Sequence, residues 1–152
     1  MALRLPGFFY KIAYQLFRLY LIIFRPRLSG VQCLVEYEGR FLLVRHSYGS
    51  SQWRPPGGNM DEDERPEEAA RRELKEEVGI EPVELRRLER NARVYRRRRP
   101  RTTYFHALVR SPQFEISSGE IEEARWFTLD EMLQLLSLKE RFIVRRHLRR
   151  RG

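Results

Sequence analysis

The sequence is poor in cysteine, glycine and lysine. Cys33 is the single cysteine among 152 residues, so the chain can form neither an intramolecular disulfide nor a cysteine zinc cluster. Glycine and proline number only 9 and 8, which excludes collagen-like and low-complexity sequence. With 41% hydrophobic and 34% charged residues, a chain of this length fits one globular domain with extensions. The lone cysteine also favours a reducing compartment, and we expect a cytoplasmic protein.

Charge is distributed unevenly, and 27 of the 30 basic residues are arginine. Residues 1–29, 86–101 and 138–152 carry net charges of +5, +8 and +6, so the remaining sequence must carry −10 to give the total of +9. Basic segments around an acidic centre would attract a polyanion and leave carboxylates free to bind cations. An arginine preference set by genome composition is the alternative explanation for each cluster.

The first 35 residues contain no acid, and residues 5–24 are apolar except for Lys11, Gln15 and Arg18. These three share one narrow stripe of a helix. Two charges near the middle of a membrane span would cost about 2.5 to 3.5 kcal/mol each, so we expect a helix in the interface rather than across the bilayer. Residues 1–24 are therefore predicted to contact an anionic membrane peripherally at its inner face. A helix that covers the sheet or a dimer partner remains the alternative, and the oligomeric state stays open.

The rest of the chain alternates strand and helix patterns. Residues 31–37 and 41–44 predict a hairpin, residues 47–60 a loop, and Pro66 to Val78 a helix that ends at Gly79. Strands are expected in 83–95 and 102–109 and at Trp126 and Phe127, and helices at 129–136 and 142–148. We therefore divide the chain into an apolar basic segment (1–29), a central domain (30–137) and a basic C-terminal helix or tail (138–152).

The predicted helix from Pro66 to Val78 gathers carboxylates. Glu73, Glu76 and Glu77 are spaced i, i+3 and i+4, which stacks them on one face within a single turn, where like charges repel. Hard divalent cations, Mg²⁺ above all, neutralise such oxygen clusters. For three glutamates alone, a solvated acidic face is the more ordinary explanation.

The residues around these glutamates favour a metal site over a solvated acidic face. Nine positions are fixed over 23 residues, in the order Gly58, five residues, Glu64, seven residues, Arg72, Glu73, Leu74, one residue, Glu76, Glu77, one residue, Gly79, Ile80. This pattern resembles the Nudix box without a departure. Trp53 and the run Pro56, Gly57 and Gly58 are similar to the family's lead-in to the box, and residues 123–127 are similar to the stretch before its final helix. The resemblance covers roughly residues 30 to 137.

The resemblance implies the α/β Nudix fold, a mixed β-sheet sandwiched between α-helices. It also implies hydrolysis of a pyrophosphate bond in a nucleoside diphosphate linked to X, where the substrate is a nucleotide, a nucleotide sugar, a dinucleoside polyphosphate or an RNA 5′ end. Carried over by position, Glu73, Glu76 and Glu77 would bind Mg²⁺ or Mn²⁺, and Arg72 would orient them. Gly58 and Gly79 would shape the loops. Glu64 would either position the metal face or cap the helix.

Two further groups of residues are candidates for the site. A later loop acid often completes Nudix sites; of Glu120, Glu122 and Glu123, we predict Glu120, because of its place before Ile121 and ahead of Trp126. Four arginines, Arg96, Arg97, Arg98 and Arg99, lie between two predicted strands and are suited to contact substrate phosphates or RNA. Contact with anionic lipid or simple solvation of this loop are the alternatives.

A Nudix-fold module that binds a nucleotide or RNA without turnover is the alternative function. The intact glutamates favour a metal-dependent hydrolase, because a binding-only relative would be expected to lack a metal ligand.

Overall fold

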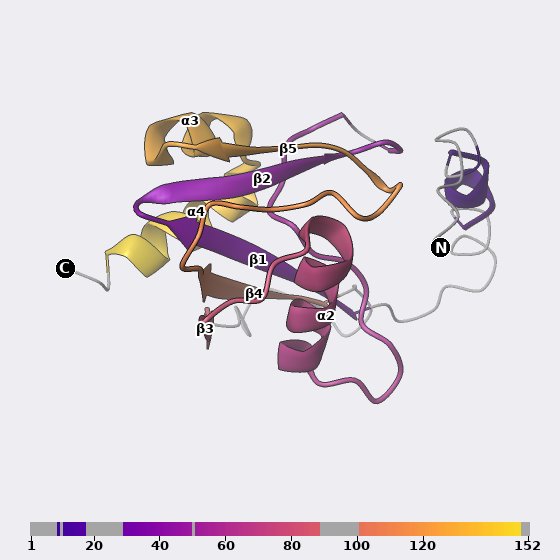
Figure 1. Ribbon diagram of the computed structural model, residues 1–152, viewed down its shortest axis with the longest axis horizontal. Helices are drawn as coiled ribbons and strands as arrows, with labels where there is room; N and C mark the ends of the chain where they lie inside the picture. Colours follow the sequence, from indigo (N-terminus) through magenta and orange to yellow (C-terminus); the bar gives the residue numbers. More distant parts are fainter. Residues whose placement is uncertain (1–8, 10, 18–28, 50, 89–100, 150–152) are drawn as a thin grey trace.

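The computed structural model describes residues 9, 11–17, 29–49, 51–88 and 101–149. Its framework is a mixed five-stranded sheet in the order β3-β4-β1-β2-β5 (Figure 1). The strands are β1 (Ser29–Tyr37), β2 (Arg40–His46), β3 (Glu84–Arg87), β4 (Arg101–Leu108) and β5 (Ile121–Phe127). β1 and β4 are parallel, whereas the β1–β2, β2–β5 and β3–β4 pairs are antiparallel. The predicted hairpin is therefore confirmed, with its turn at Glu38 and Gly39.

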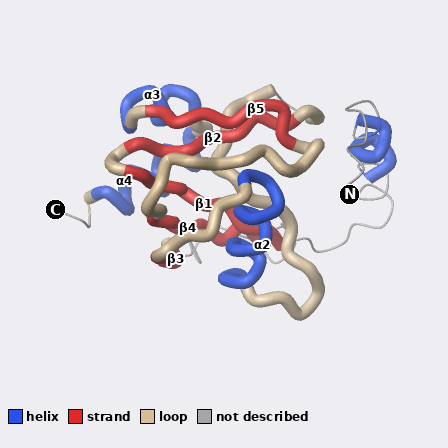
Figure 2. Tube along the Cα trace, in the orientation of Figure 1, coloured by secondary structure: helices blue, strands red, loops and turns tan. Residues whose placement is uncertain are grey.

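Helices cover both faces of this sheet. Helix α2 (Pro66–Val78) lies on one face, and α3 (Leu129–Leu135) and α4 (Leu138–Leu148) lie on the other (Figures 1 and 2). Alternate residues of β1 face the two helical layers. Val31, Cys33 and Val35 pack toward α2. Leu34 packs with Met132 and Val144 on the opposite side of the sheet. The predicted sandwich of a mixed sheet between helices is confirmed.

Helix α2 begins and ends where its sequence predicts. Pro66 occupies the first turn, and the Glu68 carboxylate accepts a hydrogen bond of 3.2 Å from the backbone N–H of Arg65. Gly79 ends the helix in the left-handed region, with φ of 66°. Ala70, Leu74 and Val78 form the predicted apolar stripe and are fully buried against the sheet. This packing fixes the adjoining acidic face of α2, which includes the buried Glu77, toward the adjacent loops.

Two predicted features lie partly or wholly outside the described residues. Arg96 to Arg99 fall in the segment 89–100, so their placement stays a prediction. Of the N-terminal segment, residues 9 and 11–17 are described and are helical. In the part of the chain that the structure describes, no helix has the length and apolar character needed to cross a membrane.

Candidate active site

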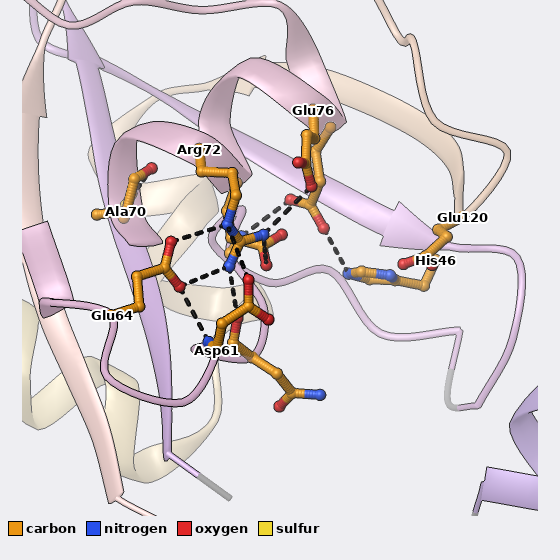
Figure 3. Close-up of polar contacts among 12 residues, drawn as sticks. His46, Asp61, Glu64, Ala70, Arg72, Glu76 and Glu120 are labelled. Atoms are coloured by element: carbon orange, nitrogen blue, oxygen red, sulfur yellow. Dashed lines mark hydrogen bonds and ion pairs between the residues drawn. The ribbon is translucent and has the colours of Figure 1, made fainter. Parts of the chain in front are cut away.

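The acidic face of α2 is organised by one arginine. Arg72 contacts Glu64 through Nε and Nη2, each at 2.9 Å from a different carboxylate oxygen. Its Nη1 lies 2.9 Å from Glu73 and 3.3 Å from Glu76, and its Nη2 also donates to the carbonyl of Asn59. Arg72 therefore joins the loop before α2 to the glutamates on the helix, as Figure 3 shows.

Glu64 is the strongest partner of this arginine. The bidentate contact lowers the pKa of Glu64 to about 2, with a further contribution from the backbone N–H of Asp61, which donates to it at 3.0 Å. The Glu64 carboxylate also raises the pKa of Arg72 above its ordinary value. Glu68, not Glu64, accepts the hydrogen bond at the start of α2, so the structure favours the first of the two predicted roles of Glu64, which is to position the acidic face.

The three glutamates of α2 differ sharply in exposure. The Glu76 side chain is 58% exposed and that of Glu73 is 13% exposed, whereas Glu77 is buried at 3%. One Glu77 oxygen accepts a hydrogen bond of 2.9 Å from the N–H of Gly57. Burial raises the pKa of Glu77 to about 8, opposed by the Gly57 N–H and reinforced by the charges of Glu73 and Glu120. Burial also raises the pKa of Glu73, although Arg72 opposes the shift.

The three motif glycines allow this arrangement. Gly57 has φ of 149°, and a Cβ there would lie 2.1 Å from the carbonyl oxygen of Val31. A Cβ on Gly58 would lie 2.7 Å from the Glu73 carboxylate. Gly79 provides the left-handed end of α2 described above. A Cβ at Gly57 would therefore push the loop away from the backbone of β1, whereas a Cβ at Gly58 would displace the Glu73 carboxylate.

Glu120 approaches the same region from the loop before β5. Its carboxylate accepts a hydrogen bond of 2.9 Å from Tyr48 Oη, and its backbone carbonyl accepts one of 2.9 Å from the N–H of Ser47. The negative charge of Glu120 contributes to raising the pKa of both Glu73 and Glu77. Glu122 and Glu123 instead pair with Arg45, at 3.5 and 2.8 Å. Of these three glutamates, the structure thus brings Glu120, and not Glu122 or Glu123, toward the acidic face of α2.

His46 is a residue of this site that the sequence did not indicate, because the three histidines are scattered along the chain and match no ligand spacing. Its Nε2 lies 3.8 Å from Glu77 Oε1, and Figure 3 shows the ring beside Glu120. Burial lowers the pKa of His46 to about 4, so near neutral pH the imidazole is uncharged and the contact is not an ion pair. Trp53, in the lead-in to the box, packs edge-on against Phe127 with a centroid distance of 5.0 Å.

The donor set fits a divalent cation. Glu73, Glu77 and Glu120 could supply oxygen ligands from two elements, and the charges of Glu73 and Glu120 help to raise the pKa of Glu77, as expected where carboxylates gather. Within the described residues, no three carboxylate, imidazole or thiol groups converge closely enough to form a ready-made metal cage. Arg72 explains this spacing, because it draws Glu73 and Glu76 to its own nitrogens.

Known proteins share this fold and motif. The profile of the NUDIX domain matches residues 26–148, a range that includes the box, the sheet and helices α2 to α4. The chain belongs to the Nudix family. The asymmetrical bis(5′-nucleosyl)-tetraphosphatase of Mus musculus is 38% identical over 125 residues, which cover 79% of this chain and 84% of the mouse protein. The phosphatase NudJ of Escherichia coli K12 is 30% identical over 120 residues, covering 77% of this chain and 78% of NudJ.

Solved Nudix structures agree in fold. The NUDIX domain of Shewanella oneidensis NrtR, solved with ADP-ribose, superposes with a TM-score of 0.65 at 24% identity and covers 84% of this chain and 92% of that one. A C. elegans Ap4A hydrolase superposes with a TM-score of 0.64 at 23% identity and covers 78% and 93%. With its family and curated relatives established, this chain is a Nudix pyrophosphohydrolase rather than a binding module without turnover. Nudix hydrolases generally use divalent metal ions.

Proposed function

We propose that this Nudix hydrolase cleaves a pyrophosphate bond in a nucleoside polyphosphate, with Mg²⁺ or Mn²⁺ as cofactor. A dinucleoside tetraphosphate is the first substrate to test, because the mouse relative is named for that activity. The observation that carries the proposal is the grouping of Glu73, held by Arg72, and Glu77, held by the N–H of Gly57, with Glu120 in the loop before β5, whose charge raises the pKa of both.

The cation would be held by Glu73, Glu76 and Glu77, with Glu120 added from the opposite side. When bound, it supplies charge neutralisation on the phosphate oxygens and an activated water. The chain's own residues do the positioning. Arg72 holds Glu73 and Glu76 on one side of the site, Glu64 holds Arg72, and the N–H of Gly57 orients the Glu77 carboxylate.

The arginine-rich segment is the proposed second contact. Arg96 to Arg99 would bind phosphates beyond the scissile bond, which is compatible with nucleoside polyphosphates and with an RNA 5′ end. Contact of residues 1–24 with an anionic membrane remains a separate proposal, because the hydrolytic residues all lie between Gly57 and Glu120.

The experiment is a hydrolysis panel on the full chain with Mg²⁺, Mn²⁺ or EDTA. The panel contains a dinucleoside tetraphosphate, a nucleoside triphosphate, ADP-ribose, a nucleotide sugar and a triphosphorylated RNA, with products separated by ion-exchange chromatography. We expect divalent-dependent release of nucleotide products, fastest with the dinucleoside tetraphosphate.

The matched variants are Glu77→Gln and Glu67→Gln. Both remove one negative charge from α2, but Glu67 lies in the exposed first turn, away from the acidic face. Glu77→Gln should lose at least about a hundredfold in kcat/KM, since loss of a metal ligand costs several kcal/mol in the transition state. Glu67→Gln should retain the wild-type rate. A Glu77→Gln enzyme within about threefold of wild type would contradict the assignment.

A further inference from the structure

The N-terminal helical segment meets the domain beside the proposed active site. Tyr14 stacks on Tyr48 with a centroid distance of 4.9 Å and is the half-buried residue of a segment whose other described residues are exposed. The backbone of Gly49 lies against the same ring, since a Cβ there would be 3.3 Å from Tyr14 Oη. Figure 1 shows the segment next to the loops that follow β2 and precede β5.

A cavity of about 670 Å³ lies between this segment and the loop after β2. Lys11, Tyr14 and Gln15 line one side of it, and residues 46–49, Ser51 and Glu122 line the other. This volume falls within the usual range for sites that bind small molecules and cofactors. The lining combines one ammonium group, two aromatic rings and several hydrogen-bonding groups, which matches the phosphate, base and ribose of a nucleotide.

The cavity wall is shared with the acidic site. His46 lies 3.8 Å from Glu77, and Tyr48 donates a hydrogen bond of 2.9 Å to Glu120. A ligand in the cavity would therefore continue directly into the region where the carboxylates gather.

Two polar groups in the cavity wall are available to a ligand. His46 is only 6% exposed, yet neither ring nitrogen has a hydrogen-bond partner among the described residues. A buried polar group without a partner is costly, so a ligand that bonds to it gains specificity. Lys11 forms no ion pair with any described residue, and Glu122, the one acid that lines the cavity, is 3.5 Å from Arg45 Nε.

We propose that this cavity binds the nucleoside monophosphate part of the substrate, with Lys11 at a phosphate and the Tyr14–Tyr48 pair against the base. The inference rests on the proposed function in that it takes the substrate to be a nucleotide. Under this proposal, residues 11–15 determine substrate specificity. They precede residues 26–148, the range that matches the family. Removal of the N-terminal segment would then weaken substrate binding as well as any contact with a membrane.

Equilibrium binding tests this without hydrolysis. Isothermal titration calorimetry on the full chain in EDTA would use AMP as the probe and inorganic phosphate as the comparison. Wild type should bind AMP more tightly than phosphate. Tyr14→Ala should weaken AMP binding roughly fivefold to a hundredfold, the range for loss of a base-stacking ring, and Tyr14→Phe should restore it. Lys11→Gln should weaken AMP binding at least threefold.

Two variants serve as matched controls. Ile12→Ala removes an exposed apolar side chain of the same segment, and Lys139→Ala removes a lysine from α4, on the other face of the sheet; both should bind AMP like wild type. The melting temperature of each variant verifies its fold. On a hydrolysed substrate, Tyr14→Ala should raise KM at least fivefold with kcat within twofold.

The outcomes separate the two proposals. Unchanged AMP affinity in both Tyr14→Ala and Lys11→Gln, or phosphate binding as tight as AMP, would overturn the nucleotide pocket whatever the enzyme hydrolyses. AMP binding that depends on Tyr14 and Lys11, in a chain that hydrolyses nothing in the panel, would support the pocket and overturn the proposed function.

Discussion

Replacement of Glu77 by glutamine should remove most of the pH dependence of stability between about pH 6.5 and 8 in the metal-free protein. Burial raises the folded-state pKa of Glu77 from 4.5 to about 8, so the folded protein holds this proton more tightly than the unfolded chain. The stabilisation is complete below pH 4.5 and is lost as the pH rises through about 8. The variant keeps the shape of the side chain but carries no charge at any pH.

The magnitude follows from linkage. One pKa unit corresponds to about 1.4 kcal/mol, so between about pH 6.5 and 8 this single group should remove on the order of 2 kcal/mol of folding free energy. For a chain of this size that is a fall of roughly 4 to 8 °C in melting temperature. The range begins at pH 6.5 because His46 also changes stability at lower pH. Burial lowers the folded-state pKa of His46 to about 4, so this group destabilises the fold only as the pH falls below its unfolded-state pKa of 6.5.

Thermal and urea unfolding in EDTA at several pH values would measure the effect. Wild type should lose stability from pH 6.5 to 8, and Glu77→Gln should show a much flatter profile. Glu67→Gln, with an exposed carboxylate on the same helix, should follow wild type. Parallel profiles for wild type and Glu77→Gln would refute the reasoning, because they would mean that the buried carboxylate does not carry the titration.

Three further predictions test other parts of the site. Arg72→Lys should lower kcat/KM at least tenfold in the hydrolysis assay. An ammonium group has one nitrogen and cannot hold Glu64 through two nitrogens while it contacts Glu73. Unchanged activity would show that the hydrogen bonds of Arg72 are dispensable. Gly58→Ala should lower kcat/KM in the hydrolysis assay more than it lowers stability in urea unfolding, since its Cβ would lie 2.7 Å from the Glu73 carboxylate, the movable end of that side chain. Gly39→Ala, with nothing within 4 Å of its Cβ, meets only the backbone cost of its φ of 75° and should keep the wild-type kcat/KM. Replacement of Arg96 to Arg99 by alanine should raise KM for polyphosphorylated substrates more than it lowers kcat. It should also reduce the salt dependence of KM. An unchanged KM and an unchanged salt dependence would assign these arginines to another partner.

The sequence predicted the helix that carries the site because local signals agree there. Pro66 and Gly79 mark its ends, and helical spacing places Glu73, Glu76 and Glu77 near one another, beside the buried stripe of Ala70, Leu74 and Val78. These are short-range relations along one helix. The box pattern then identified the family, which the profile match confirms.

Relations between distant segments were harder to predict. Periodicity cannot show that Gly57 N–H binds Glu77 or that His46 lies beside it, because both contacts depend on how the loop and β2 pack against α2. The strand expected over residues 83–95 is described only as β3, Glu84–Arg87, which pairs with β4 at the edge of the sheet. The contact of Tyr14 with Tyr48 also had no signal, since one tyrosine in an apolar run looks like any other apolar position.

The different environments of the three box glutamates indicate how the acidic face can exist before a cation binds. Arg72 neutralises part of its charge, and protonation of Glu77 near neutral pH removes another part. The contact of Arg72 with Glu76 is its longest at 3.3 Å, and Glu76 is 58% exposed, so this ion pair contributes little to stability and is the easiest to exchange. The contact with Glu64 is bidentate and partly buried, so it should persist. If Glu76 and Glu77 hold the cation as proposed, Glu77 would have to lose its proton and Glu76 would have to leave Arg72, while Glu64 would keep the arginine in place and so preserve the geometry of the site.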